Sequence, residues 1–258
     1  MMEAVLAVLS GSIVGFTLGL IGGGGSIMAT PLLLYVVGLQ PHVAIGTGAL
    51  AVSANAFINF AGHARRGNVR WRMAILFAVV GAIAAAVGSI AGKSFNGGRL
   101  LFLFAVLMVV IGVMMLRRGS KPAAAQGVEA KRPALVVASA ASVGLLSGFF
   151  GIGGGFLIVP GLLFSTGMPM IFAVGSSLLA VGAFGLTTAT SYAFSGLIDW
   201  VVAAEYIVGG IVGGIIGLRL ACHLADQKAA LNRIFAGLVF VVAFYMLYRN
   251  AAAFGLHI

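Results

Sequence analysis

The chain has few charged residues, and acidic ones are especially scarce. Only 8% of its 258 residues are Asp, Glu, Lys or Arg, whereas ordinary soluble domains have about 25%. So little charge cannot cover a water-soluble surface of ordinary size. Hydrophobic residues make up 61% of the chain, and the mean hydropathy is +1.16. These values indicate that the lipid bilayer is the solvent for most side chains.

The residues that several other classes of protein require are also missing. Cys222 is the single cysteine, which excludes an intramolecular disulfide. The sequence has no Walker lysine motif, no HExxH and no His/Asp/Glu cluster with metal-ligand spacing. We therefore expect no enzyme, no catalytic residue, no metal and no cofactor. The net charge of +10 is interpreted as basic loops that orient a membrane protein, with no nucleic acid as partner.

The long apolar stretches predict membrane-spanning helices. They are apolar on every side, whereas barrel strands alternate between apolar and polar residues. We expect an all-α, polytopic transmembrane bundle in the cell inner membrane. Each half of the chain has five segments, of which the second is about 12 residues and too short to cross alone. Whether each half crosses three, four or five times is left open. The segments are 3–21, 26–37, 41–62, 72–92 and 98–117, then 134–150, 155–166, 170–193, 200–221 and 229–249.

The two halves are copies of one unit. When Gly22 is aligned with Gly151, the halves match without a gap, with 22 identities among the 74 positions from Gly15 to Gly88. The only two tryptophans, Trp71 and Trp200, occupy the same place in the two copies. The predicted division is a first transmembrane repeat over residues 1–118, a basic cytoplasmic linker over 119–133 and a second transmembrane repeat over 134–258.

Loop charge predicts that the two repeats are inverted. The stretch 63–72 carries four arginines, whereas its counterpart 192–201 has no Lys or Arg and contains Asp199. Basic loops stay on the cytoplasmic side, so these equivalent loops are expected on opposite sides of the membrane. Inverted repeats with broken helices place a substrate site near the bilayer midplane.

Each repeat opens with a glycine-rich break, and the two breaks are the leading candidates for an anion site. Glycine lets a ligand approach the main chain. A helix that starts at such a break has unpaired N–H groups in its first turn, and this end of its dipole is positive. Dispersed glycines such as Gly15 and Gly210 are instead expected to serve close helix packing. The break residues are Gly22, Gly23, Gly24, Gly25 and Ser26 in the first repeat, and Gly151, Gly153, Gly154 and Gly155 in the second.

Polar residues in the third segment of each repeat complete the predicted site. Glu205 is the candidate for proton coupling, because charged residues inside a bilayer are functional candidates. His63 and Tyr192 are repeat partners near loops, where a histidine is expected to be solvated. The third-segment candidates are Thr47, Asn55 and Asn59, then Ser176 and Ser177; Asn55 and Asn59 share a helix face.

These motifs resemble the sulfite exporter TauE/SafE family, also called the toluene sulfonate uptake permease family. The resemblance rests on the break and the proline after it, on Gly46-Thr47 and Gly175-Ser176, and on the elements 67–71 and 196–200. It implies a transporter of sulfur-containing anions such as sulfite, sulfoacetate or another organosulfonate. Family members often have about eight spans, which fits poorly with an odd number of passes per repeat.

The resulting hypothesis is a secondary transporter that moves a small sulfur-containing anion. Its partners are the anionic substrate, the lipid bilayer and, if transport is coupled, the proton gradient. The alternatives are a passive anion channel and a membrane scaffold that transports nothing. The sequence does not specify the anion, the direction of transport or the oligomeric state.

Overall fold

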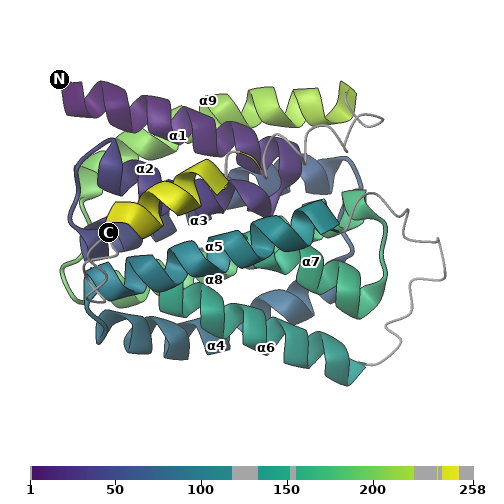
Figure 1. Cartoon of the computed structure of the whole chain (residues 1–258). Helices are drawn as coiled ribbons and strands as arrows, with labels where there is room; N and C mark the ends of the chain where they lie inside the picture. Colours follow the sequence, from purple (N-terminus) through teal and green to yellow (C-terminus); the bar gives the residue numbers. More distant parts are fainter. Residues whose placement is uncertain (1, 118–132, 152–154, 224–236, 238–239, 250–258) are drawn as a thin grey trace.

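The structure is a computed structural model of the chain, and it describes residues 2–117, 133–151, 155–223, 237 and 240–249 (Figure 1). The predicted linker over 119–133 lies almost entirely outside the described residues. Helices dominate the part that is described, and the all-α prediction is confirmed. They are α1 (Met2–Ile21), η1 (Gly23–Met28), α2 (Ala29–Tyr35), α3 (Pro41–Arg65), α4 (Trp71–Lys93), α5 (Gly97–Arg117), α6 (Pro133–Phe150), α7 (Gly155–Thr166), α8 (Met170–Ala193) and α9 (Trp200–His223), followed by a short helix over Phe240–Arg249.

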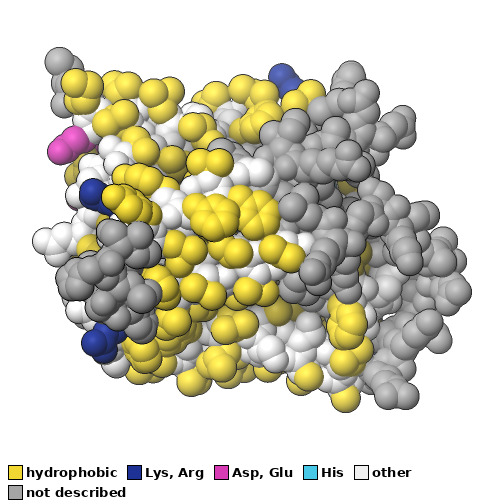
Figure 2. Space-filling view, in the orientation of Figure 1, with side chains coloured by type: hydrophobic (Ala, Val, Ile, Leu, Met, Phe, Trp, Pro, Cys, Tyr) yellow, Lys and Arg dark blue, Asp and Glu magenta, His cyan; other side chains and the backbone are white. Residues whose placement is uncertain are grey.

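Five of these helices are long and apolar enough to cross a membrane, namely α1, α3, α4, α8 and α9. Their outward faces remain apolar: Ile83 of α4 and Val212 of α9 are more than half exposed. Figure 2 shows hydrophobic side chains across the middle of one face, while the visible basic and acidic side chains lie at its edges. This distribution suits a surface in contact with lipid tails, where apolar side chains lose nothing by exposure.

Glycines with positive φ mark where helices end. Among the described residues they form three pairs, and the members of each pair occupy equivalent positions in the two repeats: Gly22 with Gly151, Gly38 with Gly167, and Gly67 with Gly196. Residues with a Cβ rarely adopt this conformation. The spacing of these chain reversals therefore follows the sequence repeat.

The main helices form two groups, each built from both halves of the chain. In the first group α1, α3 and α9 run parallel, because Gly15 packs on Gly210 and Gly19 on Gly214, while Asn55 also meets Gly210. In the second group α4 and α6 run parallel, since Gly144 packs on Gly81 and Gly148 on Ala85. The helix α8 runs parallel to them, because Phe184 packs on Gly81 and Lys93 at the end of α4 donates to the Ser191 carbonyl near the end of α8. Each half thus contributes two helices to one group and one to the other, as the upper and lower parts of Figure 1 show.

The close helix contacts confirm the packing role expected for the dispersed glycines. A Cβ added to Gly15 would overlap the Gly210 backbone, and one added to Gly144 would overlap the Gly81 backbone. These two contacts are equivalent under the sequence repeat, because Gly15 corresponds to Gly144 and Gly81 to Gly210. Small residues let membrane helices approach closely enough for backbone-to-backbone contact.

The two groups meet along the antiparallel helices α3 and α8. The Ser53 hydroxyl of α3 donates a hydrogen bond to the Gly182 carbonyl of α8 at 2.7 Å, and these residues occupy equivalent positions in the two repeats. Residues at equivalent positions that touch one another lie on an approximate two-fold axis. In Figure 1, α1 and α6 start at opposite ends of the bundle. This arrangement supports inverted repeats, although the orientation of each copy in a membrane stays a prediction.

The short second segment of the first repeat doubles back after α1. It consists of η1 and then α2, so the expected single helix over 26–37 is split in two. Figure 1 shows that α3 then begins near the end of the bundle that carries the N-terminus. This path corresponds to the alternative in which the first two segments form a hairpin and the total number of passes per repeat is odd.

Candidate functional site

The first glycine break ends α1 and begins a tighter helix. Gly22 has φ 76° and ψ −140°, a combination that is accessible almost only to glycine. Gly23 and Gly24 then open η1, and the first N–H groups of any helix have no partner within it. Gly25 and Ser26 are buried. The regular α-helix α2 starts only at Ala29, whereas the sequence predicted a helix from residue 26, directly after the break.

The second break is described only at its two ends. Gly151 ends α6 with φ 67°, and α7 begins at Gly155, which is buried. Gly153 and Gly154 lie outside the described residues. Pro160 lies inside α7, whereas Pro31 is the third residue of α2. The two breaks therefore share their first glycine and its positive φ but continue differently.

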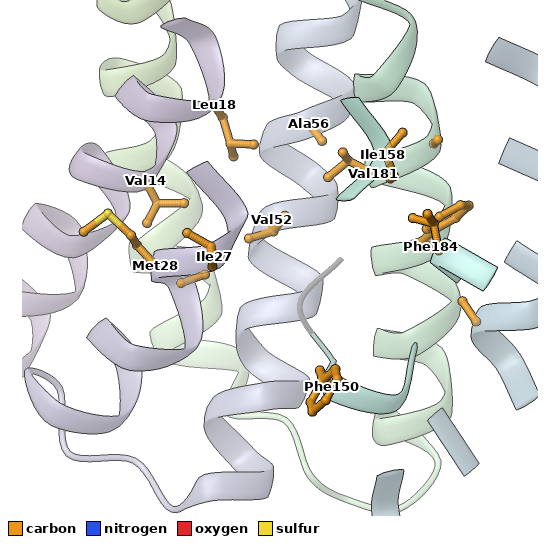
Figure 3. Packing of buried hydrophobic residues seen from close by; sticks show 14 of the residues in the cluster. Val14, Leu18, Ile27, Met28, Val52, Ala56, Phe150, Ile158, Val181 and Phe184 are labelled. Carbon is orange, nitrogen blue, oxygen red and sulfur yellow. The ribbon is translucent and has the colours of Figure 1, made fainter. Parts of the chain in front are cut away.

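Each break packs against the helix that forms the third segment of the other repeat, namely α8 for the first break and α3 for the second. A Cβ at Gly22 would lie 2.8 Å from Cγ1 of Val174 on α8, and one at Gly151 would overlap Cγ2 of Ile45 on α3. Beyond the breaks, Ile27 of η1 and Ile158 of α7 enter the apolar core between the central helices (Figure 3). Both breaks thus lie in low-dielectric surroundings, where backbone dipoles act on a charge more strongly than in water.

The Gly-Thr and Gly-Ser pairs dock the loop of the opposite repeat. The Asp199 N–H donates to Oγ1 of Thr47 at 2.9 Å, and the Arg70 N–H donates to Oγ of Ser176 at the same distance. The preceding Gly46 lies so close to the Leu197 carbonyl that a Cβ would overlap it. Both hydroxyls thus hold the loop of the opposite repeat in place. The sequence predicted them only as residues of the substrate site.

Removal of these hydroxyls is expected to lower stability. In Thr47→Val and Ser176→Ala, a part-buried loop N–H loses its acceptor, at a cost of about 0.5–1.5 kcal/mol for each hydrogen bond. Thr190→Val is the matched control, because within the part of the chain that is described the Thr190 hydroxyl bonds only to Leu186 O in its own helix. Thermal unfolding in detergent should show a lower melting temperature for the first two variants and little change for the control. Equal melting temperatures in all three would contradict the docking role.

The remaining polar candidates of the third segments differ in their hydrogen bonding. Ser177 donates to the Val174 carbonyl at 2.8 Å, and Asn59 Nδ2 donates to the Asn55 carbonyl at 2.9 Å. The side chain of Asn55 is fully buried, yet both of its amide atoms lack a hydrogen-bond partner within the described structure. Asn55 is therefore the candidate with the greatest unused capacity to bind a ligand.

His63 is buried, so the expectation that it would be solvated is wrong. Only 2% of the residue is exposed, because α3 continues to Arg65 and packs this turn against α1 and α9. The apolar run predicted a helix that ends at residue 62, whereas α3 continues to Arg65. Glu205, the predicted proton-coupling residue, is half-buried in the second turn of α9.

Comparison with known proteins identifies the family. Residues 7–246 match the family described as "Sulfite exporter TauE/SafE". A "Probable membrane transporter protein" of Xylella fastidiosa (strain 9a5c) is 53% identical over 252 residues, which cover 96% of this chain and 97% of the relative. The "Probable membrane transporter protein YunE" of Bacillus subtilis (strain 168) is 28% identical and covers 81% of this chain and 85% of its own length. The chain therefore belongs to the sulfite exporter TauE/SafE family and is a multi-pass transporter of the inner membrane.

Proposed function

We propose that this protein is a secondary transporter of a small sulfur-containing anion, such as sulfite, sulfoacetate or another organosulfonate. The observation that carries the proposal is the pair of positive-φ glycines, Gly22 and Gly151, each packed on the third helix of the other repeat. A break that bridges the two repeats changes its surroundings whenever the helix groups shift against each other. Alternating access requires this property of a substrate site.

The chemistry of the breaks favours an anion. N–H groups at the start of η1 and of α7 are donors, and neither short segment carries an acidic residue. Such N–H groups bind sulfonate or sulfite oxygens without a buried lysine, and the helix dipole favours negative charge. In this proposal the breaks contribute main-chain donors, while the Asn55 side chain contributes an amide. The N–H groups of Gly22 and Gly151 already donate to the carbonyls of Leu18 and Gly148, and that of Gly25 to Gly22. The proposed donors are Gly23, Gly24, Ser26, Gly153, Gly154 and Gly155. A proton gradient is the proposed source of energy if transport is coupled.

Transport assays in proteoliposomes test the proposal. Purified protein should bring about saturable uptake of at least one anion among sulfite, sulfate and sulfoacetate, or of the zwitterionic sulfonate taurine, and the unlabelled compound on the far side should accelerate it. The same anion should raise the melting temperature in a thermal-shift panel, because a ligand that binds only the folded state stabilises it. Uptake without saturation would indicate a channel, and no uptake with the whole panel would overturn the proposal.

A further inference from the structure

Three polar residues form a buried strip along one face of α3. Asn55, Asn59 and His63 follow each other at intervals of four residues, which places them on the same side of a helix. All three are at most 3% exposed. We call them the α3 strip, and it runs from the middle of the helix to the end that carries the arginine loop.

The α3 strip has hydrogen-bonding capacity that the protein does not use. Both amide atoms of Asn55 and both ring nitrogens of His63 lack a hydrogen-bond partner among the described residues. An unpaired buried polar group costs about 1–3 kcal/mol, so most such groups in native structures have partners. Two unsatisfied side chains in one strip therefore indicate that a ligand completes their hydrogen bonds at some stage of the transport cycle.

Glycines on the neighbouring helices make room for the strip. A Cβ at Gly210 of α9 would overlap the Asn55 amide, and one at Gly214 would lie 2.7 Å from Nδ2 of Asn59. His63 lies near the backbone of Gly19, close to the end of α1 and to the first break, but outside good hydrogen-bond geometry. The strip thus extends from the bundle interior to the proposed anion site.

The equivalent face of the second repeat is built differently. Phe184 stands in place of Asn55 and fills the notch at Gly81, where it stacks on Phe77 with ring centroids 6.3 Å apart. Tyr192 stands in place of His63, and a tyrosine stays neutral at the pH at which a histidine changes charge. The first repeat alone therefore combines amides with a titratable group on this face.

The charges around His63 are positive. Arg66 at the end of α3 is close enough for its charge to act on the ring, and Arg219 of α9 follows Leu218, which contacts Gly62. Neither α1 after Glu3 nor η1 contributes a charged residue. A buried imidazolium in these surroundings is costly unless an anion lies beside it. A bound anion and a proton on His63 should therefore stabilise each other.

We propose that the α3 strip is a combined anion and proton site, in which His63 takes up a proton from water when a small oxyanion binds next to it. The proton adds to the unprotonated ring nitrogen, and it leaves to water when the anion departs. The inference rests on the proposed transport function and assigns proton coupling to His63 in place of Glu205. Linkage requires that each ligand raises the affinity for the other by the same factor.

Proton movement during anion transport tests the inference. Proteoliposomes that contain a pH-sensitive dye are given sulfate or sulfoacetate, whichever is transported, and anion uptake and internal pH are recorded together. These anions keep their charge over the pH range of the assay, whereas sulfite itself binds a proton there. The wild type should carry protons with the anion, and its affinity for the anion should fall about tenfold from about pH 5.5 to about pH 8. His63→Gln should lose the proton movement and the pH dependence of affinity, and its affinity at every pH should be the lower one that the wild type has at the alkaline end of the range.

Matched variants separate the possible outcomes. His42→Gln removes another histidine, and Tyr192→Phe changes the repeat-equivalent position; both should keep the coupling. If His63→Gln does not give monodisperse protein, His63→Tyr copies Tyr192 and takes its place. Loss of coupling in Glu205→Gln but not in His63→Gln would overturn the inference. Anion transport by the wild type without proton movement would overturn the inference alone, whereas no anion transport by the wild type would overturn the proposed function.

Discussion

Gly22→Ala is expected to reduce anion transport by about tenfold or more, which corresponds to about 1.4 kcal/mol. Gly38→Ala, in contrast, should retain nearly normal transport. Both glycines have positive φ, 76° and 89°, so alanine introduces backbone strain at each. The two sites differ in their surroundings, and this difference is what the pair of variants measures.

The surroundings of Gly22 leave no room for a side chain. An added Cβ would lie 2.8 Å from Cγ1 and 3.3 Å from Cα of Val174, whereas no atom of the described residues lies within 4 Å of one added at Gly38. Val174 is β-branched and has little rotamer freedom. It also immediately precedes Gly175, which packs against the docked loop of the first repeat. We therefore expect alanine at Gly22 to displace the break from α8.

Initial rates of anion uptake, normalised to the amount of monodisperse protein, measure this effect. Gly151→Ala and Gly167→Ala provide a second matched pair, since Gly151 meets Ile45 while nothing lies near Gly167. Equal losses within each pair would show that backbone strain alone is responsible. Normal uptake by both Gly22→Ala and Gly151→Ala would rule out a substrate site built on the breaks.

Phe184→Ala is expected to lower the free energy of unfolding by about 3 kcal/mol. Phe184 is fully buried, fills the notch at Gly81 and stacks on Phe77. Lipid is as apolar as a helix interface, so transfer from water contributes little to helix association in a membrane. The expected loss comes mainly from the cavity and from the contacts that the ring makes between α4 and α8.

Leu186→Ala is the control, because Leu186 lies on the same helix but is 48% exposed. The contacts that Leu186→Ala removes are largely contacts with lipid, and lipid fills the space again, so the expected loss of stability is small. Reversible unfolding in mixed micelles with increasing denaturing detergent compares the two variants. Similar losses in Phe184→Ala and Leu186→Ala would contradict the packing of α8 against α4 described above.

Local features of the molecule could be predicted from the sequence to within a few residues. Apolar runs identified the long helices, because a bilayer permits few other spanning structures. The two glycine-rich stretches predicted the breaks, and Gly22 and Gly151 at their starts have positive φ, which residues with a Cβ rarely adopt. The gapless repeat predicted two copies of one unit, and the structure has contacts at equivalent positions, such as Gly15 with Gly210 and Gly144 with Gly81. Family membership was likewise predicted from short motifs and is confirmed by the comparison.

Long-range pairings were not predictable in the same way. Thr47 and Ser176 were expected to line a transport path, but their hydroxyls accept hydrogen bonds from N–H groups 152 and 106 residues away. His63 was expected in water, and it is buried because α1 and α9 cover the last turns of α3. Neither outcome follows from residues near these positions in the chain.

A helical membrane protein, its two similar halves, the places where helices break and the small residues that allow close packing could all be derived from the order of the residues. These features depend on local backbone conformation and on the free energy of placing side chains in lipid. The exchange of a helix between the repeats, in which α9 joins α1 and α3 while α4 joins α6 and α8, is visible in the folded bundle alone. The tertiary packing also sets which polar groups stay unpaired, because a hydrogen bond in a bundle depends on which helices become neighbours.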